Sequence, residues 1–480
     1  MPRTEHDFLG SMELDDSVYY GIQTVRGLGL SGLTGRSIAQ ATPELVHFCA
    51  AIKKAAALAN AEIGGLDNSV RDAIVRACDE VMAGRLADQF PTDVFTGGGG
   101  ISINMNVNEV IANRANEIIT GSKGSDAVHP NSHVNMCQST NDVIPAAMLL
   151  AFRSLLLGLA TETEALRQTF LAKADEFKDV CKLGRTCLQD ALPMTLGQEF
   201  SGYAAFAGRH VSLLGAAADA CLALPLGATA IGTGVGALPG YREGVYRHLR
   251  DITAWPLRPE ENLFDALQNA DGYVRLSAVV KSLAVGLGKI AADLRLLSSG
   301  PRGGFGEIRL PAVTPGSSIM PGKINPILPE LMRQVSFQIC GNDVAVSMAA
   351  ENGELELNVW ESVILRCLAD SCMLLSRSIP LFRDKCVAGI DADAAVCLEQ
   401  AEASTATAAL VAAVFGYETG CDVAREAVDT GKKIVQVVID RGMLGEQAAR
   451  DLLNPANLID GGAMERVVAE TRRAIAEKNT

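Results

Sequence analysis

Gly316-Ser317-Ser318-Ile319-Met320-Pro321-Gly322-Lys323-Ile324-Asn325 is the stretch around which this chain is organised. It closes a segment, Ser299–Lys323, that holds six glycines and four prolines. Gly and Pro at this density disfavour both helix and strand, so the segment is predicted to be a long loop. Long loops inside compact domains are typically active-site lids or binding loops.

A helix is expected directly after this loop. Asn325 is a suitable N-cap, Pro326 suits the first helical position, and apolar residues recur at helical spacing as far as Ile339. Two serines and a lysine would then lie just ahead of a helix N-terminus, where anions and developing negative charge are stabilised. Such a place suits a carboxylate.

The composition predicts a mainly helical protein. The chain has 480 residues, 48% of them hydrophobic and only 5% aromatic. Ala and Leu dominate, and alternating Thr/Val/Ile runs are scarce. Helical patterns of about 20 or more residues, joined by polar loops, predict an all-α fold with a long-helix bundle. The formal net charge of −14, with no basic block, disfavours nucleic acid and anionic membranes as partners.

No cofactor or metal site is indicated. The twelve cysteines are scattered without a Cys-x-x-Cys pair, which is typical of reduced thiols in a cytoplasmic protein. His129 and His133 have the spacing of a metal pair on a helix, but Pro130 and Asn131 between them favour a turn. The N-terminus has no apolar signal core and no run of about 18 apolar residues is apparent, so no membrane segment is expected.

Three other polar stretches lie beside helical patterns. Gly97-Gly98-Gly99-Gly100-Ile101-Ser102 would let backbone amides approach a ligand closely, but it lacks the strand and the Gly-Lys-Ser/Thr of a nucleotide loop. Gln138-Ser139-Thr140-Asn141-Asp142 leads into an apolar helix from near Val143. A helical run is expected to end at Lys182 with Gly184 as its C-cap, before Arg185-Thr186-Cys187.

The loop with the two serines, Ser139–Asn141 and Gly184–Thr186 resemble the signature regions of the aspartase/fumarase superfamily. Within it, the chain resembles the aspartate ammonia-lyases most, through Leu188-Gln189-Asp190-Ala191 and Leu296–Arg302. The likeness covers essentially the whole chain and includes Asp7–Gly10, Tyr19–Gly21, Asn104–Glu109 and Leu355–Asn358. The likeness implies a homotetramer with the helix bundle at its core and with active sites drawn from three subunits. Around Gly389–Asp391 the pattern shifts to shorter helices, so a small C-terminal domain is expected at 390–480, after domains at 1–138 and 139–389.

The resemblance assigns a role to each candidate. Members of the superfamily eliminate a group from a succinyl-type substrate and leave a fumarate-type alkene. Ser317 would be the base, and Lys323 and Asn325, with Thr186, would hold the carboxylate that becomes the dianionic aci-carboxylate. The other substrate-binding candidates are Ser139, Thr140 and Ser318 for the second carboxylate, Asn141 for the leaving group, and Ile101, Ser102, Cys187, Met320 and Glu330. Taken singly, Thr186, Ser139 and Thr140 are better explained as ordinary helix caps, but their occurrence together with the two-serine loop favours substrate binding.

Two positions depart from the superfamily pattern. Ile101 stands where a threonine normally helps to hold the substrate, and Cys187 stands where His or Gln is usual. In fumarases that His pairs with a glutamate, matched here by Glu330. A neutral thiol does not replace an imidazole as an acid–base group, which disfavours fumarase-type hydration. Either the leaving group has changed or both substitutions are tolerated drift.

The sequence is therefore interpreted as a cytoplasmic ammonia-lyase-type enzyme acting on a small dicarboxylate. Aspartate is the default substrate, and an N-substituted or otherwise modified aspartate is the main alternative. A fumarase-type hydratase and a non-catalytic structural or regulatory paralogue are the remaining alternatives. The last would be expected to lack Ser317 or Lys323, and both are present.

Overall fold

The computed structural model describes residues 2–478, and it is mainly helical, as the composition predicts: 64% of its residues lie in helices. The strands are short and form four two-stranded sheets among the described residues. The chain divides into two compact units. Unit 1 comprises the chain up to Thr161 together with His210–Val285 and Val335–Arg377. Unit 2 comprises Glu162–Arg209, Gly286–Gln334 and the chain from Ser378 on. The three-domain division remains a prediction.

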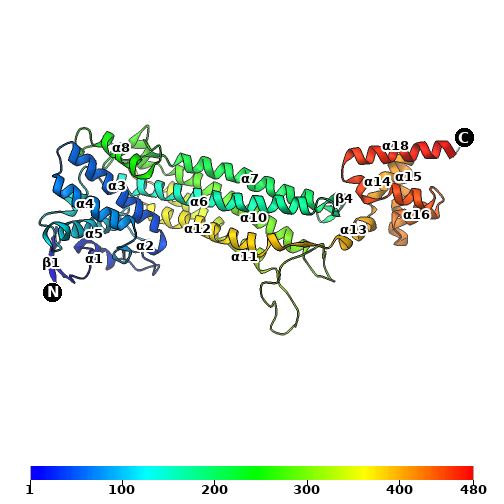
Figure 1. Ribbon diagram of the computed structural model, residues 1–480, viewed down its shortest axis with the longest axis horizontal. Coiled ribbons are helices and arrows are strands. Elements are labelled where there is room, and N and C mark those ends of the chain that lie inside the picture. The colour runs from blue at the N-terminus through cyan, green and yellow to red at the C-terminus, as the bar shows by residue number, and fades with distance from the viewer. Residues whose placement is uncertain (1, 479–480) are drawn as a thin grey trace. The chain divides into compact units, whose positions relative to one another are not determined.

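Five long helices supply segments to both units (Figure 1). They are α6 Thr140–Glu176, α7 Leu196–Ala220, α10 Asp271–Leu297, α11 Ile327–Glu351 and α12 Glu361–Lys385. The long-helix bundle expected from the sequence is seen in each unit separately, through contacts between these helices.

In unit 1 the bundle is joined by ring packing and by buried polar pairs. Phe152 of α6 packs edge-on against Tyr273 of α10, with ring centroids 5.8 Å apart. Ser277 of α10 donates to Asp343 of α11 at 2.7 Å. Asn342 of α11 donates to the Ser371 hydroxyl of α12 at 3.0 Å. These contacts link α6 to α10, α10 to α11 and α11 to α12.

The other elements of unit 1 include a second group of packed helices. Helices α3, α4, α5 and α8 pack on one another. The elements are β1 Arg3–Asp7, β2 Gly10–Leu14, α1 Ile22–Leu28, α2 Ile38–Ala41, α3 Pro43–Glu62, α4 Asn68–Met82, η1 Ala87–Gln89, α5 Ile101–Thr120, η2 Pro130–Val134, β5 Ala223–Leu224, α8 Tyr241–Thr253, β6 Arg258–Pro259 and α9 Leu263–Gln268.

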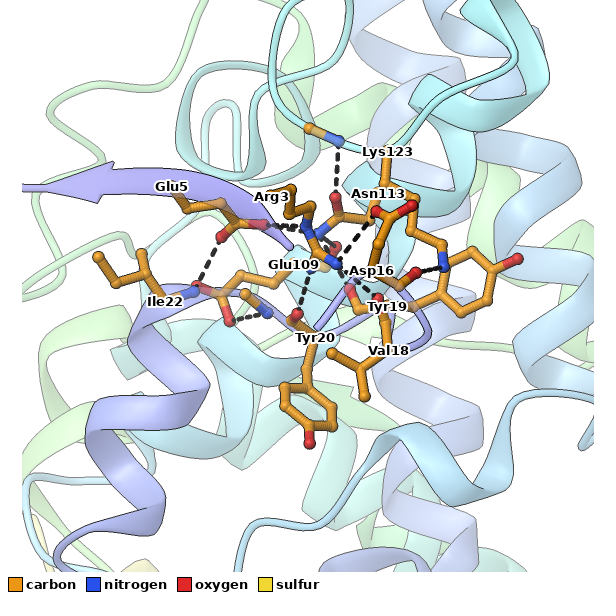
Figure 2. A network of polar contacts seen from close by, with 12 residues as sticks. Arg3, Glu5, Asp16, Val18, Tyr19, Tyr20, Ile22, Glu109, Asn113 and Lys123 are labelled. Carbon is orange, nitrogen blue, oxygen red and sulfur yellow. Dashed lines mark hydrogen bonds and ion pairs between the residues drawn. The ribbon is translucent and has the colours of Figure 1, made fainter. Parts of the chain in front are cut away.

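A buried carboxylate ties the N-terminal segment to α5. Glu109 accepts hydrogen bonds from the amides of Gly21, Gln23 and Thr24 and from the Thr24 hydroxyl, at 2.6–3.0 Å. Figure 2 shows the Arg3 guanidinium beside it, donating to the backbone carbonyls of Val18 and Tyr20. Arg3 also donates to the Asp15 carbonyl. A Cβ on Gly21 would lie 2.5 Å from a Glu5 carboxyl oxygen, so only glycine fits there. Two stretches noted in the sequence, Tyr19–Gly21 and Asn104–Glu109, are therefore parts of one anchor.

In unit 2 the bundle is aromatic. Phe170 of α6 packs against Phe200 and Tyr203 of α7, and the Tyr203 hydroxyl donates to Glu199 and to Asp293 of α10. The remaining elements of this unit are β3 Cys181–Thr186, β4 Gln189–Thr195, β7 Ile308–Arg309, η3 Val387–Gly389, β8 Asp391–Ala392, α13 Ala394–Ala403, η4 Thr405–Thr407, α14 Ala408–Phe415, α15 Tyr417–Thr430, α16 Ile434–Asp440, α17 Glu446–Leu452, η5 Pro455–Leu458 and α18 Gly461–Lys478.

The last helices of unit 2 have an apolar core of their own. Helices α14 to α17 bury aliphatic side chains against one another, among them Leu410, Val411, Val423, Val437 and Leu452. Side chains of α18, including Met464 and Val468, pack on this cluster. The shift to short helices near residue 390, expected from the sequence, is observed.

The expectations for three local elements were wrong. The helical run expected to reach Lys182 ends at Glu176, and Cys181–Thr195 forms an antiparallel hairpin. Gly184 is therefore no helix cap; it lies in β3, where a Cβ would be 2.5 Å from the Leu192 carbonyl oxygen. Helix α11 begins at Ile327, where the helical pattern begins in the sequence, but Asn325 does not cap it.

Helix α6 also differs from expectation. By length and composition it is apolar enough to cross a membrane, although no such segment was expected. In the relevant 18-residue window, 72% of the residues are buried inside the protein. The core helix of a soluble protein passes the same test, so this single helix is weak support for a membrane segment.

Candidate active site

In unit 1 the glycine run and the start of α6 form one polar corner. We call Gly98–Ser102 together with Ser139–Asn141 the α5/α6 corner. A Cβ on Gly100 would lie 3.0 Å from the Ile144 side chain, so the glycine run packs directly on the first turns of α6. Asn104 of α5 donates to the Thr140 hydroxyl at 2.9 Å. Two stretches about 40 residues apart in the sequence are thereby joined.

The glycine run leads directly into α5, and Gly99 and Gly100 within it are buried. Gly98, Gly99 and Gly100 all have positive φ, at 79°, 60° and 76°, which glycine adopts without strain. Gly100 is the N-cap of α5, with no side-chain cap and no acidic residue in the first turn. Ile101 is 44% exposed, whereas the Ser102 hydroxyl lies 3.2 Å from the Cβ position of Gly27 and so faces α1. The corner presents Ile101 to solvent, not Ser102.

Ser139 and Asp142 cap α6 reciprocally. The Ser139 hydroxyl accepts from the Asn141 amide at 3.3 Å, and the Asp142 carboxylate accepts from the Ser139 amide at 3.0 Å. Asp142 also accepts from the amides of Gly227 and Thr229. Burial raises the pKa of Asp142 to about 6, although these amides oppose the shift. Ser139 is therefore a helix cap as well as a binding candidate.

Asn135 is the hub behind this corner. Its side-chain oxygen accepts from the fully buried Lys53 ammonium at 2.8 Å, from Asn108 at 3.1 Å and from Asn104 at 3.3 Å. Burial lowers the pKa of Lys53 to about 8. Because Asn104 also bonds Thr140, the hub fixes the hydroxyl that the resemblance assigns to a carboxylate. Asn104 and Asn108, two residues of the Asn104–Glu109 stretch, were the sequence signal for this network, whereas Asn106 bonds with Thr92 and Gln89 instead.

In unit 2, Thr186 and Cys187 lie at the tip of the β3–β4 hairpin. Thr186 pairs with Gln189 across the two-residue turn of Cys187 and Leu188. Both turn residues have positive φ, 53° and 58°, the geometry of a type I′ turn. Thr186, Cys187 and Leu188 are all exposed. The explanation of Thr186 as a helix cap is therefore wrong, because no helix begins or ends there.

A buried carboxylate holds this hairpin from behind. Glu307, fully buried, contacts Arg185 at 2.7 Å and Lys182 at 3.2 Å. Arg185 also donates to Gln400 and lies over the ring of Phe305. The residue next to Thr186 is thus fixed by charge and by stacking, so the exposed tip is carried on a rigid base.

The serine loop of unit 2 is pinned at its two ends. By serine loop we mean Gly316–Asn325. The Gly316 amide donates to the Lys323 carbonyl at 2.8 Å, and the Asn325 side chain donates to the Gly316 carbonyl at 2.9 Å. A Cβ on Gly316 would lie 2.7 Å from the Asn325 nitrogen and 2.8 Å from the Lys323 oxygen. The predicted loop is therefore present, and Asn325 closes it.

Within this loop the Ser317 hydroxyl has a distinctive environment. Its oxygen accepts from the Ile319 amide at 3.2 Å and from the Met320 amide at 3.0 Å. Ser318 and Lys323 are exposed, and Lys323 makes no ion pair within residues 2–478. Met320 is 48% exposed. Backbone amides aimed at an oxygen favour its anionic form, so Ser317 is set apart from Ser318.

Glu330 lies in the first turn of α11, where its carboxylate is 3.5 Å from Arg295.

The candidate residues form two sets. One set lies in unit 1 at the α5/α6 corner, and the other lies in unit 2 at the hairpin tip, the serine loop and the start of α11. Among the described residues there is no group of three or more His, Cys, Asp or Glu side chains placed to hold a metal ion.

Comparisons with known proteins agree along the chain. A family model described as Lyase matches residues 10–341, and one described as Fumarase C C-terminus matches residues 408–460. An aspartate ammonia-lyase from Bacillus sp is 45% identical, covering 97% of this chain and 99% of the relative. An aspartate ammonia-lyase from Escherichia coli (strain K12) is 42% identical, covering 95% and 96%.

Solved structures match the fold equally fully. A fumarate lyase:delta crystallin from Brucella melitensis bound to cobalt has a TM-score of 0.93 at 43% identity, over 96% of this chain and 100% of that chain. A recombinant class II fumarase from Schistosoma mansoni has a TM-score of 0.90 at 35% identity, over 96% and 99%. Since the family model matches more than half of the chain and the relatives match nearly all of it, this chain belongs to the aspartase/fumarase superfamily and is a lyase.

Proposed function

We propose that this lyase eliminates an amine-type group from an aspartate-like, 2-substituted succinate to give fumarate. The Ser317 oxygen, which accepts two backbone amides, is the observation that carries the proposal. Those amides stabilise an alkoxide, and an alkoxide is the form in which a serine acts as a base. The similar aspartate ammonia-lyases support an amine as the leaving group.

The reaction follows from the positions of the charges. The Ser317 alkoxide takes a proton from the carbon next to a carboxylate, and the C–H electron pair moves into that carboxylate as a dianionic aci-carboxylate. The exposed Lys323 ammonium is the positive charge that stabilises this species, with Thr186 as a further donor. The electron pair on the aci-carboxylate then returns to form the carbon–carbon double bond. At the same time the C–N bond breaks, and the amine leaves with the C–N electron pair. Ser139, Thr140 and Ser318 hold the second carboxylate, and Asn141 faces the leaving group.

A second candidate substrate is an aspartate with a substituted amine or another leaving group. Ile101 is exposed at the start of α5, and the exposed Cys187 stands at the hairpin tip. Neither offers the hydrogen bonds that Thr and His would offer to an ammonium or to water. A bulkier or less polar leaving group would lose little by these changes, whereas fumarase-type hydration would lose its imidazole.

The active enzyme is proposed to be a cytoplasmic homotetramer with sites shared between subunits. The candidate residues fall into two sets, one in each unit, and the resemblance implies that each complete site draws on three chains. Light scattering should give four times the 50.6 kDa subunit mass. Mixing Ser317→Ala subunits with Thr186→Ala subunits should restore part of the activity, since some hybrid sites carry neither lesion.

The direct test compares Ser317→Ala with Ser318→Ala. Fumarate formation from L-aspartate and from N-substituted aspartates is followed by ultraviolet absorbance. Ser317→Ala should lower kcat at least ~10²–10⁴-fold, with succinate binding unchanged. Within residues 2–478 no amide donates to the Ser318 hydroxyl, whereas two donate to that of Ser317, so the Ser318 variant should act mainly on KM. A severe loss of kcat in Ser318→Ala with an active Ser317→Ala would reverse the assignment.

A further inference from the structure

Glu361 is a buried carboxyl group that the helix bundle leaves unpaired. It is the first residue of α12 and is only 5% exposed. Its Oε2 atom has no hydrogen-bond partner within residues 2–478. Burial raises the pKa of Glu361 to about 7, opposed only by its own backbone amide. An unpaired buried polar atom is destabilising and calls for an explanation.

The unpaired oxygen faces the glycine run. The position that a Cβ would occupy on Gly99 lies 3.7 Å from Glu361 Oε2 and 3.7 Å from the Val359 side chain. Only the hydrogen of a glycine therefore separates this carboxyl from the loop ahead of α5. The cation on the next turns of α12, Arg366, lies over the ring of Phe95 and is 3.9 Å from Asp370, so it is engaged elsewhere.

The glycine run and the carboxyl beside it favour opposite charges. The uncapped start of α5 offers the positive end of its helix dipole to an anion. Glu361, beside Gly99, offers a negative charge to a cation. A molecule that carries a carboxylate and an ammonium on one carbon would satisfy both.

We propose that Glu361 is the specificity-determining counter-charge for the ammonium group of an α-amino acid whose carboxylate meets the start of α5. The inference rests on the proposed function and deepens it, because it assigns amine recognition to a residue that no motif singled out. An ionised Glu361 stabilises a bound ammonium and gives nothing to a hydroxyl or to an unsubstituted carbon. The site therefore selects amino dicarboxylates over their hydroxyl and unsubstituted analogues.

The test separates amine recognition from general damage to the site. In the full-length Ser317→Ala protein, which should not turn over, calorimetry measures binding of L-aspartate and of succinate, with and without Glu361→Gln. Aspartate affinity should fall about 10- to 100-fold, the loss expected for one charged hydrogen bond, while succinate affinity changes less than about twofold. Both ligands depend equally on the fraction of folded protein, so the ratio of the two affinities is insensitive to partial unfolding.

Two further variants complete the design. Glu44→Gln is the matched control, because Glu44 also has a buried unpaired oxygen in unit 1 and lies outside the α5/α6 corner; it should change neither affinity. Glu361→Asp withdraws the carboxyl by one methylene while leaving the glycine run unchanged, and it should reproduce the selective loss even if Glu361→Gln fails to fold. Equal losses for both ligands, or no loss for aspartate, would overturn the inference. Aspartate turnover by Ser317→Ala would instead refute the proposed base. The role of Glu361 would then be tested by comparing the KM for aspartate with and without Glu361→Gln, and an unchanged KM would overturn it.

Discussion

Replacing Gly316 by alanine should disable the serine loop without unfolding the protein. The added Cβ would lie 2.7 Å from the Asn325 nitrogen, 2.8 Å from the Lys323 oxygen and 3.0 Å from the Asn325 side chain. Two of these neighbours are backbone atoms that cannot rotate away. The substitution therefore forces Gly316 away from the Lys323–Asn325 segment, which it contacts at the base of the loop.

The size of the effect follows from these contacts. Ordinary van der Waals contact begins near 3.4 Å, so the closest neighbour must move by about 0.7 Å (3.4 − 2.7). A shift of that size stretches the bonds from Gly316 to Lys323 and from Asn325 to Gly316, now 2.8 and 2.9 Å, to about 3.5 Å, where they no longer count as hydrogen bonds. Two bonds at about 0.5–1.5 kcal/mol each give about 1–3 kcal/mol, or a ~5- to 150-fold lower population of the closed loop.

Activity should fall by the same factor, because only the closed loop carries Ser317 in its amide environment. The assay is kcat/KM for fumarate formation, alongside thermal unfolding, which should change little because the loop is exposed. Gly303→Ala is the matched control: nothing lies within 4 Å of its Cβ position and its φ is not positive, so its activity should be that of the wild type. Equal activity of Gly316→Ala and Gly303→Ala would refute the link between loop closure and catalysis.

Three other results are expected. Since burial raises the pKa of Glu361 from 4.5 to about 7, the folded protein holds this proton more tightly than the unfolded chain, and the stability it provides is lost as the pH rises through that range. Relative to the wild type, Glu361→Gln should gain about 2–3 kcal/mol in urea unfolding between about pH 5 and pH 8, and a pH-independent difference would contradict the assigned shift. Leu188→Gly should raise the urea midpoint by relieving about 1 kcal/mol of left-handed strain at φ 58°, and a lower midpoint would show that the side chain packs usefully. Ile101→Thr should raise kcat/KM for aspartate about 2- to 10-fold by adding one hydrogen bond. Cys187→His should raise it further or give activity on malate. Wild-type turnover of aspartate at ~10–100 s⁻¹ would instead show that both substitutions are tolerated drift.

The sequence was sufficient for the features that depend on local chemistry. The Gly/Pro density of Ser299–Lys323 predicted the loop, and the apolar spacing after it predicted α11. The polar stretch Gln138–Asp142 was also recognised as leading into α6. Each of these depends on backbone preferences within a few residues, which a single sequence records.

The features that depend on contacts between distant residues were not predicted. The β3–β4 hairpin has a Cys-Leu turn in place of the usual Asn-Gly, so its turn carries no sequence signal. The Asn325 side chain was expected to cap α11, but Gly316 lies within reach across the loop and takes the hydrogen bond. Glu361 has no motif at all, since its significance arises only from the unpaired oxygen beside Gly99.

The unpaired polar atoms of unit 1 argue that its α5/α6 corner is built for binding and not for stability. Asn104, Asn108, Gln138 and Glu361 each have a buried oxygen without a partner within residues 2–478, and Asn104 and Asn108 share the Asn135 hub. Each such atom costs about 1–3 kcal/mol. Apolar side chains of similar volume would remove that cost, and α5 and α6 are otherwise rich in them. A folded chain tolerates unpaired oxygens where a ligand or a reaction uses them, and these four lie near the residues that we propose bind the substrate.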